Sequence, residues 1–325
     1  MTKILGIGNA LVDIIIKLDS DKILDDFSLP KGSMQLINKE KIKFMLEHTA
    51  DYKKHKSSGG SAANTIHGLS KLGVKTGYIG KIGDDELGTF FTNDMSKLNI
   101  EPVVYKSQTA TGTCMSFVSP DTERTLCTYL GAAIELNAED LVESAFNGYD
   151  YFHIEGYLVQ NHELIERALY LAKKNNLYVS LDLASYNVVE ENFEFLKSLT
   201  KKYVDIIFAN EEEAKAFTGE EQAEKALDII AEYCDIAVVK IGRFGSLIKK
   251  DNKTYKIGVI DSQYIDTTGA GDLYASGFLY GLTKNYDLEK SGKIGAITSG
   301  NVIEIIGTKM SDDKWTAIKN QIEQI

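Results

Sequence analysis

Short apolar strands alternate with longer amphipathic helices along most of this chain, and this alternation limits the fold more than any other feature. The strand candidates are KILGIG (3–8), TGYIGKIG (76–83), YFHIEG (151–156), LYVSLDL (177–183), DIIFAN (205–210), IAVVKIG (236–242) and GSLIKK (245–250). The helix candidates are AANTIHGLSKLG (62–73), DDELGTFFTNDMSKLN (84–99), NHELIERALYLAKKNN (161–176) and EQAEKALDIIAEYC (221–234). This order predicts an α/β fold with a mostly parallel central sheet flanked by helices. Such sheets bind ligands in the crevice beyond the carboxyl ends of their strands.

Two regions depart from this rhythm. Residues 12–38 and 102–130 alternate apolar and polar residues and show no intervening helix, as a sheet with one exposed face should. We expect these two insertions to form a small β-sheet lid over the cleft. The chain has 325 residues, only 3 prolines, and no linker or internal repeat. Residues 1–325 are therefore predicted to form one α/β domain that carries the lid.

The net charge of the chain limits the classes of partner that it can bind. Its 36 Lys and Arg against 47 Asp and Glu give a formal net charge of −11. Nucleic acid is an unsuitable partner because its backbone demands a basic surface, whereas a small ligand can be held by local features. Cys114, Cys127 and Cys234 show no CxxC pair or metal-ligand spacing, which is typical of core cysteines in a reducing cytosol. No apolar run approaches the roughly 20 residues of a membrane span, and no signal-peptide pattern is found, so a cytoplasmic protein without a membrane partner is expected.

The most informative segment is YIDTTGAGDLYASGFLYGL (264–282). Gly269, Ala270 and Gly271 leave backbone N–H groups unshielded where an extended segment is predicted to pass into a helix. Free N–H groups and the helix macrodipole at such a point attract an anion such as a phosphoryl group. Asp272 follows at once and could take the proton of a hydroxyl that attacks phosphorus. The alternative is a helix capped by a glycine turn, with Asp272 favourable at its N-terminus.

Two segments near the start of the chain are candidates for binding a substrate. In KSSGGSAANTIHGLSKLG (56–73), paired glycines precede a helix of small residues, and Asn64 projects from its first turns. In GIGNALVDI (6–14), Asn9 and Asp13 follow the first strand, where polar side chains suit sugar hydroxyls. The alternatives are a flexible loop with a polar helix start for the first segment and a turn aspartate for the second.

Two later segments are candidates for a nucleotide or metal site. In DIIFANEEEAKAFTG (205–219), Asn210 and Glu213 share one face of a helical turn. Oxygen ligands of this kind suit water-bridged Mg²⁺, and the alternative is a capping asparagine beside solvated glutamates. In VVKIGRFGS (238–246), Gly242 and Gly245 flank an exposed turn that suits an adenine nucleotide or a plain hairpin.

The order of these segments resembles the ribokinase-like (PfkB) family of carbohydrate and nucleoside kinases over essentially the whole chain. DTTGAGD (266–272) is similar to the most specific signature of the family, and GGSAAN (59–64) is similar to its N-terminal signature. Asn210 and Glu213 match its NxxE magnesium motif. The resemblance implies a ribokinase-like fold with a β-lid and transfer of the γ-phosphate of ATP, with Mg²⁺, to a primary hydroxyl.

The resemblance also implies a role for each matching residue. Asp272 would be the catalytic base, and Gly269, Ala270 and Gly271 would form the anion hole. The other implied sites are the substrate site (Asp13, Gly60 and Asn64, with Asn9 nearby), the Mg²⁺ site (Asn210 and Glu213), the ATP site (Gly242 and Gly245) and a monovalent-cation site for K⁺ (Asp266 and Thr268).

Within the family, the segment GTCMSFVSPDTERTLCTYLGAA (112–133) resembles the lid of adenosine kinases, which implies a nucleoside acceptor. In that comparison Arg124 would reach the transferred phosphate when the lid closes, with an exposed surface arginine as the alternative. The base-stacking aromatic of adenosine kinases corresponds to Leu158, next to Tyr157. Tyr105, Phe117 and Tyr129 are further stacking candidates, or they pack the lid.

The acceptor and the assembly stay open at this point. Lys56 is the only basic residue near the substrate loops, so an unphosphorylated acceptor is favoured over a phosphorylated sugar. The alternatives to a nucleoside kinase are a fructokinase- or ribokinase-type sugar kinase and a non-catalytic ligand-binding relative. A Rossmann dehydrogenase is disfavoured because GIGNAL lacks the full GxGxxG. A homodimer through the lid is a further expectation, based on its apolar alternation.

Overall fold

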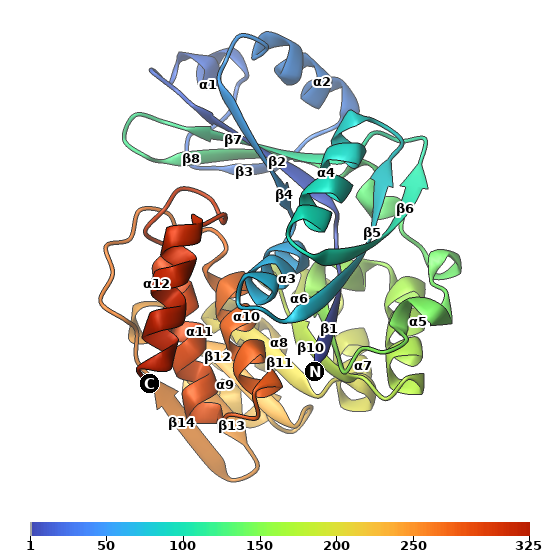
Figure 1. The fold of residues 1–325 in the computed structure, drawn as a ribbon, viewed down its shortest axis with the longest axis vertical. Helices are drawn as coiled ribbons and strands as arrows, with labels where there is room; N and C mark the ends of the chain where they lie inside the picture. The colour runs from blue at the N-terminus through green and yellow to red at the C-terminus, as the bar shows by residue number, and fades with distance from the viewer. Residues whose placement is uncertain (1) are drawn as a thin grey trace.

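The computed structural model describes residues 2–325 and contains two β-sheets (Figure 1). The strands of the larger sheet are β1 (Lys3–Ile7), β5 (Lys75–Gly83), β6 (Ile100–Ser107), β9 (Tyr151–Glu155), β10 (Tyr178–Asp182), β11 (Ile206–Asn210), β12 (Ile236–Lys240), β13 (Ser246–Lys250) and β14 (Lys253–Ile257). Their order in space is β14-β13-β12-β11-β10-β9-β1-β5-β6. The pairs β12–β13 and β13–β14 are antiparallel and all other pairs are parallel. The predicted mostly parallel α/β sheet is therefore confirmed.

The first strand lies inside the sheet, between β5 and β9. From β1 the chain first builds outward through β5 and β6, and later in the opposite direction from β9 to β14. The crevice between β1 and β9 is thus the point at which the strand order reverses, where open α/β sheets bind their ligands.

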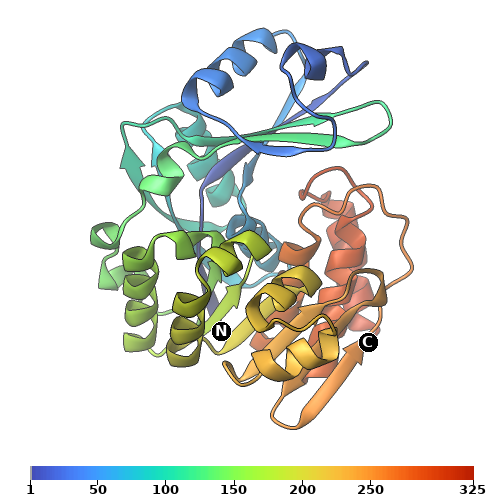
Figure 2. The same ribbon diagram turned by 180° about the vertical axis from the view of Figure 1, so that it is seen from behind.

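Helices cover both faces of the larger sheet, as the two views in Figures 1 and 2 show. One face carries α3 (Ser61–Lys71), α4 (Glu86–Lys97), α10 (Ala270–Thr283) and α11 (Leu288–Val302), with α12 (Asp312–Glu323) packed on the last two. The other face carries α5 (His162–Lys174), α6 (Tyr186–Glu191), α7 (Phe193–Tyr203), α8 (Glu211–Thr218) and α9 (Ala223–Ile230). Successive strand residues alternate between these two layers: Phe208 packs with the first and Ile207 with the second.

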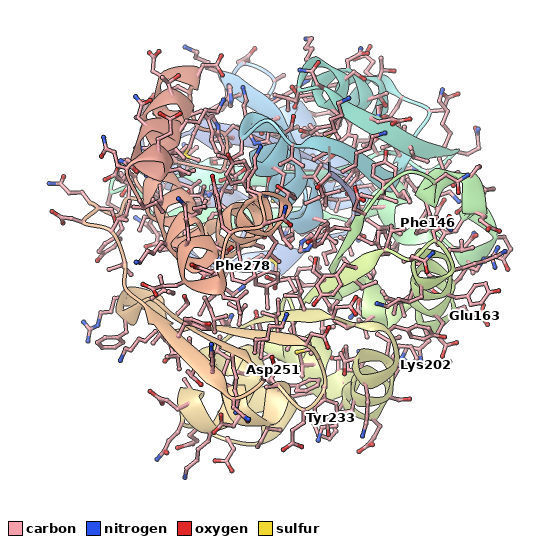
Figure 3. All side chains as sticks on the ribbon, turned by 60° about the horizontal axis from the view of Figure 1, so that its bottom comes forward. Phe146, Glu163, Lys202, Tyr233, Asp251 and Phe278 are labelled. Carbon is pink, nitrogen blue, oxygen red and sulfur yellow. The ribbon has the colours of Figure 1, made fainter. Side chains whose placement is uncertain are left out.

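Apolar side chains lie between these layers and most charged side chains lie on the outside (Figure 3). Phe146 and Phe278 are buried, whereas Glu163 and Lys202 are exposed. Among residues 2–325, no helix is long and apolar enough to cross a membrane.

The smaller sheet, which we call the lid, lies beyond the carboxyl ends of the larger one (Figure 1). Its strands are β2 (Leu11–Lys17), β3 (Met34–Leu36), β4 (Lys54–Gly59), β7 (Gly112–Val118) and β8 (Arg124–Tyr129), in the order β3-β8-β7-β2-β4. Two helices, α1 (Lys22–Asp26) and α2 (Lys39–His48), pack against one face of the lid through Ile23, Phe27 and Met45. The other face looks toward the larger sheet.

Three details of the predicted lid differ from the structure. The segment from residue 102 belongs to β6, which pairs with β5 in the larger sheet rather than with the lid. Residues 54–59 form the lid strand β4, which the two predicted insertions did not include. Residues 12–38 contain the helix α1, whose five residues are too few to show a helical period in the sequence. Alternation identifies a strand but carries no information about which sheet the strand joins.

Candidate active site

The lid and the carboxyl ends of the larger sheet enclose a cavity of about 1340 Å³. Its walls come from both sheets and from the N-terminal end of α10. Of the residues that the sequence singled out, the cavity brings together Asp13, Gly60, Asn64, Arg124, Asn210, Glu213, Gly242, Gly245, Thr268, Gly269, Ala270, Gly271 and Asp272. Asn9 and Asp266 do not line it.

The glycine turn lies at the start of α10, with Gly269 as the N-cap residue at φ 74°. This left-handed backbone favours glycine, and a Cβ atom on Gly269 would lie 2.4 Å from Cγ2 of Thr308. One expectation was wrong: no strand runs into this turn, because β14 ends at Ile257 and residues 258–269 form an irregular loop. The three residues of the turn line the cavity, and the Ala270 N–H donates to the Thr267 carbonyl oxygen over 3.1 Å.

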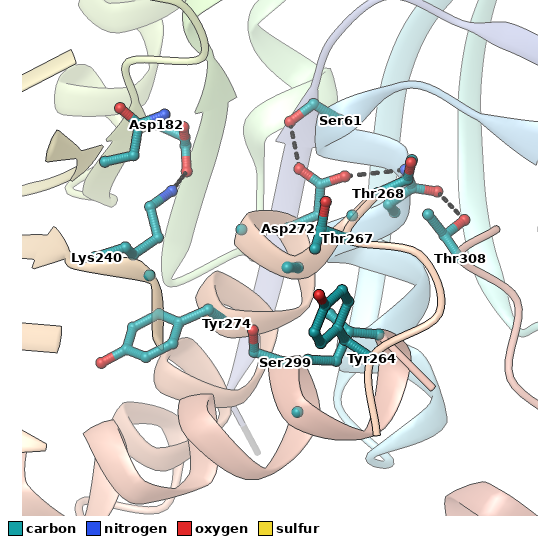
Figure 4. Close-up of a pocket in the computed structure, with 18 of the residues that line it drawn as sticks. Ser61, Asp182, Lys240, Tyr264, Thr267, Thr268, Asp272, Tyr274, Ser299 and Thr308 are labelled. Carbon is teal, nitrogen blue, oxygen red and sulfur yellow. Dashed lines mark hydrogen bonds and ion pairs between the residues drawn. The ribbon is translucent and has the colours of Figure 1, made fainter. Parts of the chain in front are cut away.

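Asp272 lies in the first turn of α10 and is held by two residues of α3 (Figure 4). Ser61 Oγ donates to its Oδ1 over 2.7 Å, and Asn64 Nδ2 donates to its Oδ2 over 3.0 Å. Burial raises the pKa of Asp272 to about 6, although these two hydrogen bonds act in the opposite direction. A carboxylate with a raised pKa that faces a cavity is suited to accept a proton near neutral pH.

Lys240 lies beside the same turn at the carboxyl end of β12. Its Nζ donates to Asp182 Oδ2 at the end of β10 over 2.8 Å (Figure 4). A Cβ atom on Gly271 would lie only 3.0 Å from this Nζ, so the ammonium reaches the glycine turn because Gly271 has no side chain. The site thus offers a cation as well as N–H groups to an anion.

Glu213 and Asn210 form a capping box at the start of α8. Asn210 Oδ1 accepts from the Glu213 N–H over 2.8 Å, and the Glu213 carboxylate accepts from Asn210 N and Nδ2, both over 2.7 Å. The capping role weighed for Asn210 is therefore present, and Glu213 completes it rather than being solvated. Burial and the nearby Asp182 raise the pKa of Glu213 to about 7.

Asp13 projects from β2 into the cavity from the lid side. Gly59 on the paired strand β4 makes room for it, because a Cβ atom there would lie 2.3 Å from Asp13 Oδ1. Gly60, at φ 101°, passes so close to Asn9 that its Cβ would lie 2.1 Å from the Asn9 carbonyl oxygen. Burial raises the pKa of Asp13 to about 6.

The structure gives Asn9 a different position from the one expected. Its backbone N–H and its Nδ2 donate to Glu155 Oε1 over 2.8 and 2.6 Å, outside the cavity lining. Glu155 Oε2 also accepts from Ala62 N over 3.0 Å. The buried Glu155 carboxylate therefore ties the end of β1 to the first turn of α3, and Asn9 belongs to this support.

Arg124 and Asp266 are paired with each other. Arg124 Nη1 donates to Asp266 Oδ2 over 2.5 Å, and the same carboxylate accepts from Gly307 N and Thr268 N over 2.8 and 2.9 Å. Both oxygens of Asp266 thus accept hydrogen bonds, and its role in a cation site stays a prediction. Arg124 lines the cavity, but its guanidinium joins the lid to the loop before α10 instead of extending freely over a substrate.

The turn with Gly242 and Gly245 connects the antiparallel strands β12 and β13, so the hairpin alternative is present. Both glycines also line the cavity, on the side of Lys240. A Cβ atom on Gly245 would lie 1.8 Å from the carbonyl oxygen of Ile257. The two interpretations of this segment are therefore compatible.

Comparison with known families agrees with this arrangement. The sequence profile described as "pfkB family carbohydrate kinase" matches residues 35–315. The chain belongs to the pfkB family of carbohydrate kinases. It is accordingly a phosphotransferase that acts on an alcohol group of a sugar or a nucleoside.

The relatives of this pfkB kinase include proteins named as sugar kinases and proteins named as adenosine kinases. A 5-dehydro-2-deoxygluconokinase of Clostridium perfringens is 30% identical over 269 residues, which cover 77% of this chain and 79% of that protein. A probable sugar kinase of Rhizobium etli has a TM-score of 0.87 at 34% identity, with 99% of this chain and 100% of that chain covered. The adenosine kinase of Sinorhizobium meliloti has a TM-score of 0.86 at 33% identity, with 98% and 99% covered.

Several residues of this pfkB kinase site were not identified from the sequence. They are Ser61, Glu155, Asp182, Lys240, Thr308 and Lys309. Ser61 lies inside the GGSAAN segment, so its position was available, but its hydrogen bond to Asp272 depends on how α3 packs on α10. Asp182 and Lys240 are the last residues of β10 and β12, and the position at a strand end was the signal that could have identified them.

Proposed function

We propose that this protein transfers the γ-phosphoryl group of ATP to the primary hydroxyl of a nucleoside. The observation that carries the proposal is Asp272, a half-buried carboxylate that lines the cavity in the first turn of a helix and is held by two donors. At this turn the hydroxyl of an acceptor would face the Asp272 carboxylate, and a phosphate would face backbone N–H groups.

The proposed chemistry is a single displacement at phosphorus. The acceptor oxygen forms a bond to the γ-phosphorus as the bond to the bridging oxygen breaks, and ADP leaves. Asp272 takes the acceptor hydroxyl proton. The N–H groups of Gly269 and Gly271 stabilise the charge on the phosphoryl oxygens, while that of Ala270 is bonded to Thr267. Positioning and charge stabilisation then supply most of the rate, as in other phosphoryl transfers.

A nucleoside acceptor is favoured by the cavity-facing surface of the lid. Leu11, Asp13 and Leu126 line the cavity there, and they offer apolar contact around one carboxylate. Met34 pairs with Leu126 across the strands and is 58% exposed, so it extends this apolar surface. A free sugar has polar groups on every side, whereas a nucleoside has a sugar edge for Asp13 and a flat base for the leucines.

Three tyrosines line the cavity: Tyr157, Tyr264 and Tyr274. Tyr274 is buried and its hydroxyl is hydrogen-bonded to Ser246, and Tyr264 lies in the loop before α10. Tyr157 lines the cavity and is 38% exposed, whereas its neighbour Leu158 is 6% exposed and packs in the core. The other stacking candidates do not line the cavity: Tyr105 lies on β6 in the larger sheet, Phe117 packs on Phe27, and Tyr129 lies outside the lining. Tyr157 is therefore our candidate for stacking the base.

Mg²⁺ with ATP fits the nucleotide side of the site. The carboxylates of Asp182 and Glu213 meet there with Lys240 as their cation, and burial together with the nearby Asp182 raises the pKa of Glu213. Asp182 and Glu213 would hold Mg²⁺ through its water ligands, and the ion would neutralise phosphate charge when bound. The K⁺ site expected at Asp266 and Thr268 stays a prediction and is not needed for the proposed chemistry.

The test is release of ADP by the purified protein in the presence of ATP and Mg²⁺, measured by a coupled assay. The acceptor panel comprises adenosine, inosine, cytidine, ribose, fructose and 5-dehydro-2-deoxygluconate. We expect the highest kcat/KM with one of the nucleosides. A preference for a sugar or for the sugar acid would refute the nucleoside proposal and favour the sugar kinase alternative. Failure of every acceptor to stimulate ADP release would refute the proposed function as a whole.

A further inference from the structure

Lys309 is a cationic residue at the acceptor end of the site that the chemistry above does not use. It lies in the segment between α11 and α12, next to Thr308. It lines a small cavity of about 40 Å³, together with Asp13, Arg124 and Thr268. Asp13, Arg124, Thr268 and Thr308 also line the large cavity, so Lys309 lies directly behind the acceptor end of the proposed active site.

The first contact of Lys309 is with the residue that holds the base. Its Nζ donates to Asn64 Oδ1 over 3.1 Å, and Thr308 Oγ1 donates to the same oxygen over 2.9 Å. Two donors on one side identify that atom of the amide as the oxygen. The other side must then be the NH₂ group, which donates to Asp272. Lys309 and Thr308 therefore fix the orientation in which Asn64 can hold the base.

The second contribution of Lys309 is charge. The acidic groups around it are Asp13 on β2, Asp94 on α4 and Asp272 on α10. Two other basic groups, Arg124 and His55, line the small cavity. The pKa of the buried His67 side chain on α3 is lowered by burial and, to a smaller extent, by Lys309. Arg124 is already paired with Asp266. This leaves the Lys309 ammonium as the cation that faces Asp13.

The pKa values of Lys309 and Asp13 agree with this geometry. Burial lowers the pKa of Lys309 to about 8, even though Asp13 acts to raise it. Burial raises the pKa of Asp13 to about 6, and the charge of Lys309 is the largest effect that opposes this rise. Each group thus keeps the other charged in surroundings that favour the neutral forms.

We propose that Lys309 is a positioning residue of the acceptor site, which fixes the Asn64 amide against Asp272 and supplies the counter-charge that keeps Asp13 able to accept hydrogen bonds from the acceptor hydroxyls. The proposal rests on the proposed function and deepens it. In this proposal Lys309 links Asp13, the binding carboxylate on the lid, to Asp272, the catalytic carboxylate on α10.

The experiment compares Lys309→Met with the wild type, using an acceptor that the wild type phosphorylates. Loss of a hydrogen bond to a charged donor and of the counter-charge should raise the acceptor KM and lower kcat, by about 10- to 100-fold in kcat/KM, while the KM for ATP changes by less than about threefold. The acid limb of the pH profile of kcat/KM for the acceptor should move to higher pH, because Asp13 without its cation has a higher pKa. Lys309→Arg keeps the charge and should leave the acid limb at the pH of the wild type.

Lys314→Met is the matched control. Lys314 lies in the same part of the chain and pairs with Glu304 at the surface, so its loss should leave kcat, both KM values and the pH profile unchanged. If Lys309→Met does not fold, Lys309→Gln takes its place, since it keeps one donor for Asn64 and removes the charge.

Two outcomes would overturn the inference. The first is an unchanged pH profile, with any loss of activity matched by a lower melting temperature, since this would show a purely structural lysine. The second is an equal rise in the KM for ATP and for the acceptor. A wild-type protein without any acceptor-dependent activity would instead refute the proposed function, so the two failures are distinguishable.

Discussion

Asp272 has two hydrogen-bond donors yet a pKa above the ordinary value for aspartate, because its burial outweighs them. Ser61 and Asn64 orient both carboxylate oxygens, and neither residue carries a charge. The site therefore keeps the carboxylate basic while it fixes its direction. A direct ion pair would have oriented it equally well but would have lowered its pKa.

Asp272→Asn should lower kcat by about 10²–10⁴, the range for a lost general base. ATP binding, measured by calorimetry, should survive because the N–H groups of the turn are unchanged. The melting temperature should stay level or rise, since the variant removes a buried charge whose folded-state pKa is raised. Near wild-type turnover would show that Asp272 is not the base.

The pH dependence of kcat tests the same residue without a substitution. Asp272 must be ionised to accept a proton, and its pKa is about 6. Turnover should therefore be constant above this pH and fall by about tenfold per unit below it. A profile that stays flat down to pH 4.5, with the protein still folded by circular dichroism, would contradict the assignment.

At the scale of elements, the start of α10 depends on two glycines for different reasons. Gly269 needs its left-handed backbone and the space next to Thr308, whereas Gly271 makes room for the ammonium of Lys240. The turn is thus shaped by side chains from β12 and from the segment after α11, far from it in the sequence.

Gly269→Ala should lower kcat by at least about tenfold and destabilise the fold, because the new methyl group collides with Thr308. Gly219→Ala is the matched control: Gly219 has a similar φ of 80° and nothing within 4 Å of the added Cβ. The control should lose only about 1–2 kcal/mol of stability, from backbone strain alone, and keep its kcat. Equal kcat values in the two variants would rule out a special role for the turn.

The elements also show what a sequence can and cannot predict. The repeating strands and helices of the larger sheet were predictable because each has its own local period. The assignment of β6 and β4 to their sheets was not, because pairing partners are distant in the sequence. The GAGD turn was recognisable because its residues are consecutive in the sequence. Single charged residues such as Asp182, Lys240 and Lys309 were not, because their positions in the site depend on the sheet order and on the packing of the C-terminal segment.

At the scale of the whole molecule, the Arg124–Asp266 ion pair joins the lid to the loop before α10. Arg124 is also held by Ser116 in the lid through a hydrogen bond of 2.9 Å from Nε. The pair therefore connects the lid side of the cavity to the loop that leads into the glycine turn.

Arg124→Met should raise the acceptor KM by about tenfold and affect the KM for ATP less, because the lid is held less firmly over the acceptor. It should also lower the melting temperature, since Asp266 is left without its cation. Lys31→Met is the control, because Lys31 pairs with Asp21 and Asp121, both in connections between lid strands. Unchanged kinetic constants for Arg124→Met would show that the ion pair does not control the lid.

A homodimer through the lid stays a prediction. Because α1 and α2 cover one face of the lid and the other faces the cavity, such a dimer would have to use the edge strands β3 and β4. Sedimentation velocity at two protein concentrations would test it.

The edge strand β4 of the lid is separated from α3 by Gly60 alone. Ser61 is the first residue after this glycine, and it holds Asp272. A rotation of the lid about Gly60 would therefore also turn the group that aims the base. We expect arrival of the acceptor and activation of the base to be one event, so that ATP bound alone is protected from wasteful attack by water.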